Sequence, residues 1–453
     1  MSALPLLNAM LGNARVEACF ATAAWVRRML AFERALAQAQ AELSLVPPAL
    51  ATALAELTPD DFDLDALVAQ TAESATPAIP FVQQLTALVA RRDAALAGHV
   101  HAGATSQDVM DTALVLCARE ALDEIDAETM AVVRLLRDLA AQHRETLAVA
   151  RTLGQPAGPT TFGARVAGWL HAVLDARDEL RSLRSRLPLQ CAGATGTLAS
   201  FNAAAPALVD AIAARLALRA ARPWHTDRRP VRELAAALAG AAAALGKVAG
   251  DLLAMMQAEV GELAEAAAPG RGGSSALPHK RNPVASVAAV AAARRAPGLL
   301  STVYAAFDHG FERAAGAWHA ETEALVALCI TAGAGFDALR RALQGMTVDA
   351  TAMRRNLDAL RGLDASEAAS RALAAGLGQA AAQAIVREAC TQVRDGAGSL
   401  FEVLARDARV TALVSPDRLR EALAPEAHLG QAHALTDAAV ARAQAELAAT
   451  ASR

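Results

Sequence analysis

Helical periodicity runs through almost all of this 453-residue chain and constrains its fold more than any other feature. Strand-like alternation is nearly absent. Hydrophobic residues make up 54% of the chain but aromatic residues only 3%, so alanine and leucine dominate, and both favour helices. Apolar residues recur at helical spacing over Trp25–Leu45, Asp108–Arg144, Thr161–Leu187, Val231–Ala268 and Val284–Leu328, the last interrupted near Gly310 and Gly316. The sequence therefore predicts an all-α protein.

The longest of these segments are too apolar for one chain to bury. Val231–Ala268 contains no proline and predicts a helix on the order of 50 Å long. We expect such helices to form a bundle that also packs against the same bundle of other subunits. After about Gly362 the helices become shorter, with turns at Pro416 and Pro425. We predict an N-terminal helical domain (1–109), a central long-helix bundle (110–355) and a small C-terminal helical domain (356–453).

Composition excludes several classes of function. The net charge of −4 gives no basic footprint for nucleic acid. The five cysteines are far apart and show no ligand spacing, so we expect neither disulfides nor a metal site, and a reducing cytoplasm. The first residues lack a basic segment followed by an apolar one, which predicts no signal peptide. The longest apolar runs, of about a dozen residues, are too short for a bilayer.

The loop from Gly273 to Pro283 combines serines, a lysine and an asparagine between turn-forming residues. Of 43 basic residues only two are lysine, and Lys280 is one of them. A lysine that persists in a chain so rich in arginine suggests a site that needs a compact ammonium rather than a planar guanidinium.

Four polar clusters interrupt the apolar background, at residues 101–108, 151–159, 273–283 and 309–319. Taken singly, the first fits ordinary helix capping, the second a plain loop and the fourth a salt-bridged helix face. Together they supply donors suited to carboxylate oxygens. No phosphate loop or dinucleotide fingerprint accompanies them, so we expect a cofactor-free site for an anionic substrate. The candidate residues are His101, Thr105, Ser106, Thr152, Gln155, Ser274, Lys280, Asn282 and Arg313.

Three clusters also carry recognisable motifs. Residues 273–283 (GSSALPHKRNP) resemble the GSSxMPxKxNP signature of the fumarase/aspartase superfamily of lyases. Residues 101–112 resemble its HxGxTSQDxxDT block, and residues 151–163 resemble its GRTxxQxAxPxTFG block, in the same order and with fitting spacing. The likeness covers nearly the whole chain. It is greatest to the branch of 3-carboxy-cis,cis-muconate cycloisomerases, through residues 103–108, 224–226, 257–261, 278–283, 316–319 and 361–367.

This resemblance implies an all-α homotetramer with active sites shared between subunits and a small tricarboxylate substrate. The implied reaction interconverts 3-carboxy-cis,cis-muconate and 4-carboxymuconolactone in aromatic-acid breakdown, by proton transfer next to a carboxylate through an aci-carboxylate. Ser274 matches the catalytic serine, and Lys280 would be the cation that stabilises its alkoxide. Asn282 and the Thr105–Ser106 pair would hold substrate carboxylates.

Departures from the family pattern leave alternatives open. Leu153 stands where fumarases and adenylosuccinate lyases carry histidine, which disfavours a C–N lyase close to adenylosuccinate lyase. Asp227, Arg229, Gln383 and residues 309–311 also depart, and they put the substrate in doubt more than the fold. A non-enzymatic relative that kept only the helical bundle is the remaining alternative, and the intact motifs argue against it.

Overall fold

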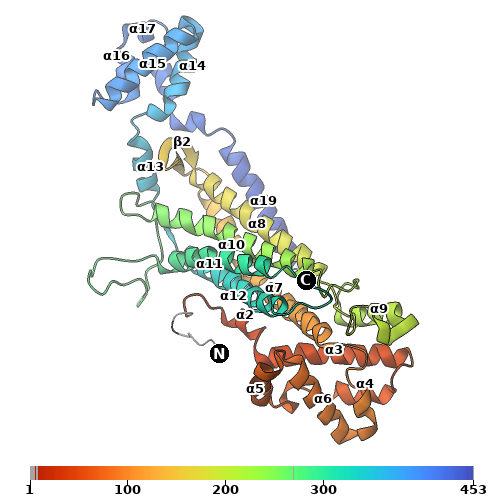
Figure 1. Ribbon diagram of the computed structural model, residues 1–453. Coiled ribbons are helices and arrows are strands. Elements are labelled where there is room, and N and C mark those ends of the chain that lie inside the picture. Colours follow the sequence, from red (N-terminus) through yellow and green to blue (C-terminus); the bar gives the residue numbers. More distant parts are fainter. Residues whose placement is uncertain (1–5, 7–8, 269, 452–453) are drawn as a thin grey trace. The chain divides into compact units, whose positions relative to one another are not determined.

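The computed structural model covers the whole chain and describes all residues except 1–5, 7–8, 269 and 452–453. Most of the described chain is helical, and its two sheets have only two strands each, which confirms the predicted all-α class. Five long helices dominate (Figure 1): α7 (Ser106–Gln142), α8 (Phe162–Ser185), α10 (Arg229–Met255), α11 (Val284–Ala305) and α12 (Ala317–Leu343).

The chain forms two compact units, each assembled from separate stretches of sequence. Unit 1 comprises Met1–Thr129, Asp175–Gly246 and Ala288–Ala338, and unit 2 comprises Met130–Leu174, Lys247–Val287 and Leu339–Arg453. The division falls within the five long helices, so each of them contributes one end to each unit. The division into three consecutive domains stays a prediction.

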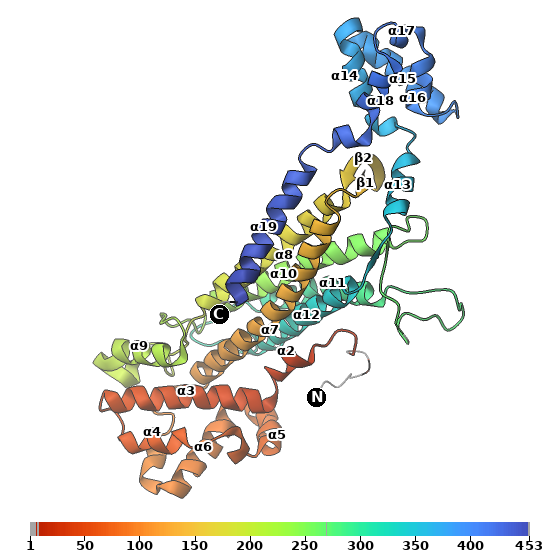
Figure 2. The same ribbon diagram turned by 180° about the vertical axis from the view of Figure 1, so that it is seen from behind.

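Unit 1 packs short helices with the ends of the long ones (Figure 2). Buried Arg177 of α8 donates to both carboxylate oxygens of Asp126 on α7, at 2.6 and 3.1 Å, and Arg184 pairs with Asp123 farther along the same two helices. These ion pairs fix how α7 and α8 align. The other elements of this unit are α2 (Ala14–Ala18), α3 (Thr22–Glu42), α4 (Pro48–Ala55), η1 (Pro59–Asp61), α5 (Leu64–Ser74), α6 (Ala78–Arg92), η2 (Ala94–His99), η3 (Ala199–Ala204) and α9 (Ala205–Leu216).

Unit 2 carries both sheets and a helical C-terminal part. Strands β1 (Leu147–Thr152) and β2 (Gln155–Thr161) form a hairpin, and β3 (Leu263–Ala264) pairs antiparallel with β4 (Thr347–Val348). The remaining elements are α13 (Ala350–Asp358), η4 (Leu363–Ala365), α14 (Ser366–Leu377), α15 (Gln379–Arg394), α16 (Leu400–Arg406), α17 (Ala408–Thr411), α18 (Pro416–Leu423), η5 (Pro425–His428) and α19 (Ala432–Ala451).

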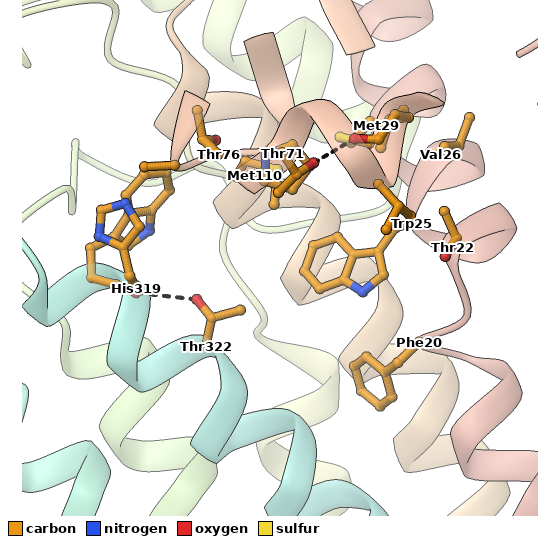
Figure 3. Close-up of a pocket in the computed structure, with 15 residues that line it drawn as sticks. Phe20, Thr22, Trp25, Val26, Met29, Thr71, Thr76, Met110, His319 and Thr322 are labelled. Atoms are coloured by element: carbon orange, nitrogen blue, oxygen red, sulfur yellow. Dashed lines mark hydrogen bonds between the residues drawn. The ribbon is translucent and has the colours of Figure 1, made fainter. Parts of the chain in front are cut away.

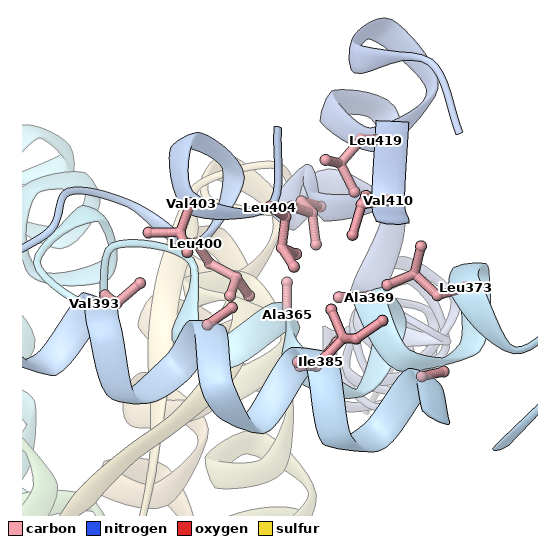
Figure 4. Close-up of a cluster of buried hydrophobic side chains, with 14 residues drawn as sticks. Ala365, Ala369, Leu373, Ile385, Val393, Leu400, Val403, Leu404, Val410 and Leu419 are labelled. Atoms are coloured by element: carbon pink, nitrogen blue, oxygen red, sulfur yellow. The ribbon is translucent and has the colours of Figure 1, made fainter. Parts of the chain in front are cut away.

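The helices from α14 to α18 enclose a hydrophobic cluster of their own (Figure 4). Leu373, Ile385, Val393, Leu400 and Leu404 are buried in it. Pro416 begins α18 and Pro425 begins η5, as the turns predicted at these prolines require. The helices α14–α18 are shorter than the five long ones, as predicted after Gly362, whereas α19 spans 20 residues.

Helix positions follow the periodicity, but two predictions were wrong. Val231–Ala268 was expected as one helix, whereas α10 ends at Met255 and the chain turns into β3, where the buried Glu262 carboxylate binds Arg151 and Asn356. Residues 151–159 were expected as a helix-to-helix loop, whereas they belong to the hairpin. Tertiary contacts of Glu262 determine the end of α10, and an unusual turn determines the hairpin. Neither leaves a periodic signal in the sequence.

By length and composition alone, α10 and α12 could each cross a membrane. The predicted limit of about a dozen apolar residues was therefore too short for these two helices. Core helices of soluble proteins have the same length and composition. The most apolar window of α12 is 72% buried, while that of α10 is only 44% buried. More than half of the most apolar window of α10 is therefore not buried within the single chain.

Candidate functional site

The start of α7 brings together three of the predicted residues in unit 1. Arg313, from the loop before α12, donates to Thr105 Oγ1 at 2.9 Å and lies 3.4 Å from Ser106 Oγ. It also donates to the carbonyl of Ala194 at 3.2 Å. A guanidinium beside two hydroxyls at a helix N-terminus is a favourable place for a carboxylate, because donors and helix dipole act together.

Buried Asp108 holds this helix start in place. Its carboxylate accepts hydrogen bonds from the backbone N–H of Thr105 (3.1 Å), from Ala192 and Gly193 (both 2.8 Å) and from Gln190 Nε2 (3.3 Å), and it lies 2.9 Å from His225 Nε2. The predicted capping role at this helix start thus falls to Asp108, which reaches back to the first turn as in a capping box. Asp108 positions the cluster and does not itself face it.

One turn further along α7, a buried ionic network connects α7 to α10 and α12. Arg228 donates to Asp111 at 2.7 and 2.9 Å and to Glu321 at 2.5 and 2.8 Å, and Trp318 Nε1 donates to Asp111 at 2.9 Å. Burial, with a smaller contribution from the negative charge of Asp111, raises the pKa of Glu321 to about 7 against the opposing effect of Arg228. The sequence did not single out Arg228 or Glu321, since each looks like an ordinary surface charge on a helical pattern.

Three histidines of the predicted clusters lie in unit 1, and two of them, His101 and His309, lie beside a buried glutamate. His101 Nδ1 is 2.5 Å from Glu33 Oε1, and although burial alone would lower the pKa of His101, this carboxylate raises it overall. The side chain of His309 is buried with Nε2 3.6 Å from Glu321 Oε2, and burial together with Arg228 lowers its pKa. His101 thus favours the charged form that can bind an anion, whereas His309 favours the neutral form.

Glu321 gives a pH-dependent stability that can be measured. The pKa of Glu321 in the folded state, about 7, lies above its ordinary value of 4.5. The stabilisation of the fold by protonated Glu321 is therefore fully present below pH 4.5 and is lost as the pH rises through 7. Glu321→Gln cannot ionise, so the free energy of unfolding of the variant relative to wild type should rise between pH 5 and pH 8 by about 1–3 kcal/mol. Urea unfolding at both pH values measures this. Glu323→Gln, an exposed position on the same helix, is the control, and an equal change there would contradict the assignment.

In unit 2, the loop before α11 carries Ser274, Lys280 and Asn282. The Ser274 hydroxyl oxygen accepts backbone N–H groups from Leu277 at 3.1 Å and Ala276 at 3.4 Å. Such donors stabilise negative charge on an oxygen. The loop closes at a narrow neck, where Asn282 N donates to Gly272 O at 2.7 Å. A Cβ on Gly272, whose φ is +71°, would meet Asn282 O at 2.4 Å, so only glycine fits there.

Glu265 anchors both ends of this loop. Its carboxylate accepts from Ser286 N and Oγ, both at 2.7 Å, from Ala285 N at 3.3 Å and from Arg271 at 3.1 Å. The start of α11 is thereby tied to the start of the loop. Residues 275–281 between these ends are exposed, so the loop is fixed at its base and open at its tip.

The hairpin presents Thr152 and Gln155 opposite each other across its turn. Leu153 and Gly154 form the turn with φ of 51° and 76°, a pair of positive values typical of a type I′ hairpin turn and strained for leucine. Leu153 is fully exposed at the tip. Behind it, Arg151 donates to the buried Glu262 at 2.7 and 3.2 Å, and Asn356 Nδ2 donates to Glu262 at 2.8 Å. Glu262 therefore fixes the turn end of the hairpin.

The structure thus gathers the predicted residues into separate groups. One group is in unit 1, around Thr105 and Arg313, and two are in unit 2, on the Ser274 loop and on the hairpin. Among the described residues, no three His, Cys, Asp or Glu side chains gather as a metal site. Of the family departures, Asp227, Arg229, Gln383 and Phe311 are solvent-accessible on the surface of their elements, while Arg228 between the first two is buried.

Comparison with known proteins decides the family. Residues 6–298 match the family model described as Lyase, and residues 362–439 match that of the adenylosuccinate lyase C-terminus. This chain belongs to the lyase family of the fumarase/aspartase superfamily. The predicted resemblance is confirmed.

Individual relatives are similar in sequence to this chain over nearly its full length. It is 42% identical over 439 residues to a 3-carboxy-cis,cis-muconate cycloisomerase of Pseudomonas aeruginosa, covering 96% of each chain. It is 41% identical over 445 residues to a nitrosuccinate lyase of Streptomyces davaonensis, covering 96% of this chain and 94% of the relative. The solved 3-carboxy-cis,cis-muconate lactonizing enzyme of Pseudomonas putida matches with a TM-score of 0.91 at 39% identity, over 97% of this chain and 99% of its own.

Proposed function

We propose that this protein is a cycloisomerase that interconverts 3-carboxy-cis,cis-muconate and 4-carboxymuconolactone in the breakdown of aromatic acids. The relatives of that name and activity, alike over nearly the whole chain, support it. The observation that carries the chemistry is the Ser274 hydroxyl, which receives two backbone N–H groups on a loop that also holds Lys280. No cofactor enters the proposed reaction.

In the proposed reaction, Ser274 moves the proton at the carbon next to a carboxylate. A serine hydroxyl is too weakly acidic to do so unaided, so the N–H groups of Ala276 and Leu277, with Lys280, would stabilise its alkoxide. Starting from the lactone, the serine takes the proton, the aci-carboxylate forms, and the C–O bond to the ring carboxylate breaks. In the lactonising direction that carboxylate attacks and the serine returns the proton.

The substrate carries three carboxylates, and the proposed donors fall into three groups to match. Thr105, Ser106 and Arg313 would hold one carboxylate at the start of α7. His101, whose pKa the Glu33 carboxylate raises, would belong to the same group. Asn282 would hold a second beside Ser274. Thr152 and Gln155 on the hairpin would reach the third. We propose that these groups come from three different chains of a homotetramer.

The homotetramer is a prediction with its own support in α10. Beyond its first residue, the exposed positions along this helix are Gly240, Ala243, Lys247, Gly250 and Ala254, a spacing of alternating three and four residues that is typical of a helix–helix seam. Sedimentation at micromolar concentration should give a tetramer. Ala243→Glu should shift it to smaller species, because a charge is then buried at the seam. Ala384→Glu, an exposed position on α15, is the control, and a monomeric wild type would contradict the prediction.

The Ser274 loop is predicted to act as a lid that closes over the substrate. Its tip is exposed and its base is fixed by Glu265, which is the arrangement that allows closure without unfolding. Hydrogen exchange of residues 270–283 should therefore slow when propane-1,2,3-tricarboxylate binds. Residues 416–423 of α18 serve as the internal control. Equal exchange with and without this tricarboxylate, at a concentration that inhibits turnover, would refute the lid.

A second candidate is a lyase that removes a group from a substituted succinate, which the 41% identity to a nitrosuccinate lyase favours. The adenylosuccinate type is disfavoured, since the exposed Leu153 replaces the histidine of those enzymes. Ultraviolet assays with 3-carboxy-cis,cis-muconate, nitrosuccinate and adenylosuccinate separate the three. We expect turnover of the first to exceed that of the others by at least about 10²-fold. Preferred turnover of nitrosuccinate would replace the proposal with the second candidate.

A further inference from the structure

Unit 1 contains a cavity of about 330 Å³ that none of the proposed catalytic groups uses. It is lined by residues from the starts of α3, α7 and α12, from α5 and from the turn between α5 and α6. Figure 3 shows the rings of Phe20, Trp25 and His319 around it, together with Met29 and Met110. This volume is at the small end of ligand pockets and suits a molecule of one ring.

The chemistry of the wall excludes the substrate class proposed above. No Asp, Glu, Lys or Arg side chain lines the cavity, so a carboxylate placed there would lose its hydration with at most the His319 imidazole as a charged partner. The aromatic rings and the thioethers of Met29 and Met110 instead favour an aromatic guest, through ring–ring and sulfur–ring contacts. The guest is therefore uncharged and aromatic.

Two threonine hydroxyls in the wall, those of Thr71 and Thr322, favour a guest that donates a hydrogen bond. Thr71 Oγ1 already donates to Leu67 O at 2.8 Å, and Thr322 Oγ1 donates to Trp318 O at 3.2 Å. Each hydroxyl has given its proton to its own helix, so it can only accept from a guest. A guest that donates a hydrogen bond, such as a phenol, satisfies both the rings and these oxygens.

The cavity lies close to the proposed carboxylate cluster along α7. Met110 follows Ser106 by four residues and so faces the same side of the helix, one turn or about 6 Å further on. Trp318, also in the wall, donates to Asp111 of the buried network. A guest in the cavity thus adjoins the groups that position the start of α7.

We propose that this cavity is a binding site for an uncharged single-ring phenol, separate from the site for the carboxylate substrate. The proposal goes beyond the proposed function and does not depend on it. Binding of 4-fluorophenol to the full-length protein, followed by fluorine NMR, should be saturable. 4-Fluorobenzoate, which has the same ring with a negative charge, should bind at least about tenfold more weakly, because the wall offers no lysine or arginine.

A variant that fills the cavity tests its location. Val68 lines the cavity but is 56% exposed, so Val68→Trp should fill the mouth without disturbing the core. This change should weaken 4-fluorophenol binding by about tenfold or more, through overpacking. Leu435→Trp, at a 58% exposed position of α19, is the matched control and should leave binding unchanged.

Three outcomes would overturn the proposal. The first is unsaturable binding of 4-fluorophenol, and the second is equal binding by the Val68→Trp variant. In the third, wild type binds nothing while Leu153→Ala binds the phenol. The exposed Leu153 of another copy would then be the natural occupant of the cavity.

Discussion

Ser274→Ala is expected to abolish turnover while leaving the fold and most of the substrate binding intact. Because the hydroxyl acts only while the proton moves, its loss should appear in kcat and hardly in substrate affinity. Positioned proton transfer contributes roughly 10²–10⁴-fold in rate, so kcat should fall at least that far. Lactonisation of 3-carboxy-cis,cis-muconate, followed by ultraviolet absorbance, gives kcat, and calorimetry with the inactive variant gives the affinity.

The neighbouring serine provides the control for this experiment. Ser275 lies on the same exposed loop, and Ser275→Ala removes an identical hydroxyl one residue away. We expect it to remain within a few-fold of wild type. If Ser274→Ala lactonised at a near-normal rate, the proton donor would lie elsewhere, and His101 and His319 would be the next residues to test.

Lys280→Arg is expected to lose about 10²-fold or more in kcat although the charge is kept. A guanidinium is larger than an ammonium and spreads its charge over a plane, so it cannot serve as a compact donor beside both the serine alkoxide and a carboxylate. The rarity of lysine in this arginine-rich chain is the sequence evidence for this expectation. The same ultraviolet assay measures it.

The chain's other lysine is the matched control. Lys247 belongs to none of the proposed substrate-binding groups; it lies in the seam proposed for α10, where it pairs with Asp251 one turn away, and arginine keeps that charge. Lys247→Arg should therefore keep normal kcat. A near-normal Lys280→Arg would mean that Lys280 is only a charge in the wall of the site, and that its rarity carries no functional signal.

The sequence by itself determined the helical elements and the candidate residues. Periodicity is local, so the positions of α3, α7 and α8 follow from apolar spacing to within a few residues. The Ser274 loop was visible because unusual residues gather within one short stretch. The sequence marked the segments of Thr105 and Arg313 as rich in donors, but it did not pair the two residues, because they are 208 positions apart.

Tertiary structure alone decided the residues that hold these segments in place. Arg228 meets Asp111 across 117 positions and Glu321 across 93, and no local pattern marks such charges as partners. Likewise, the end of α10, the turn end of the hairpin and the base of the loop depend on Glu262 and Glu265, whose partners lie in other elements. Buried charges require partners wherever the chain supplies them, so their positions are fixed by how the chain packs and not by its local sequence.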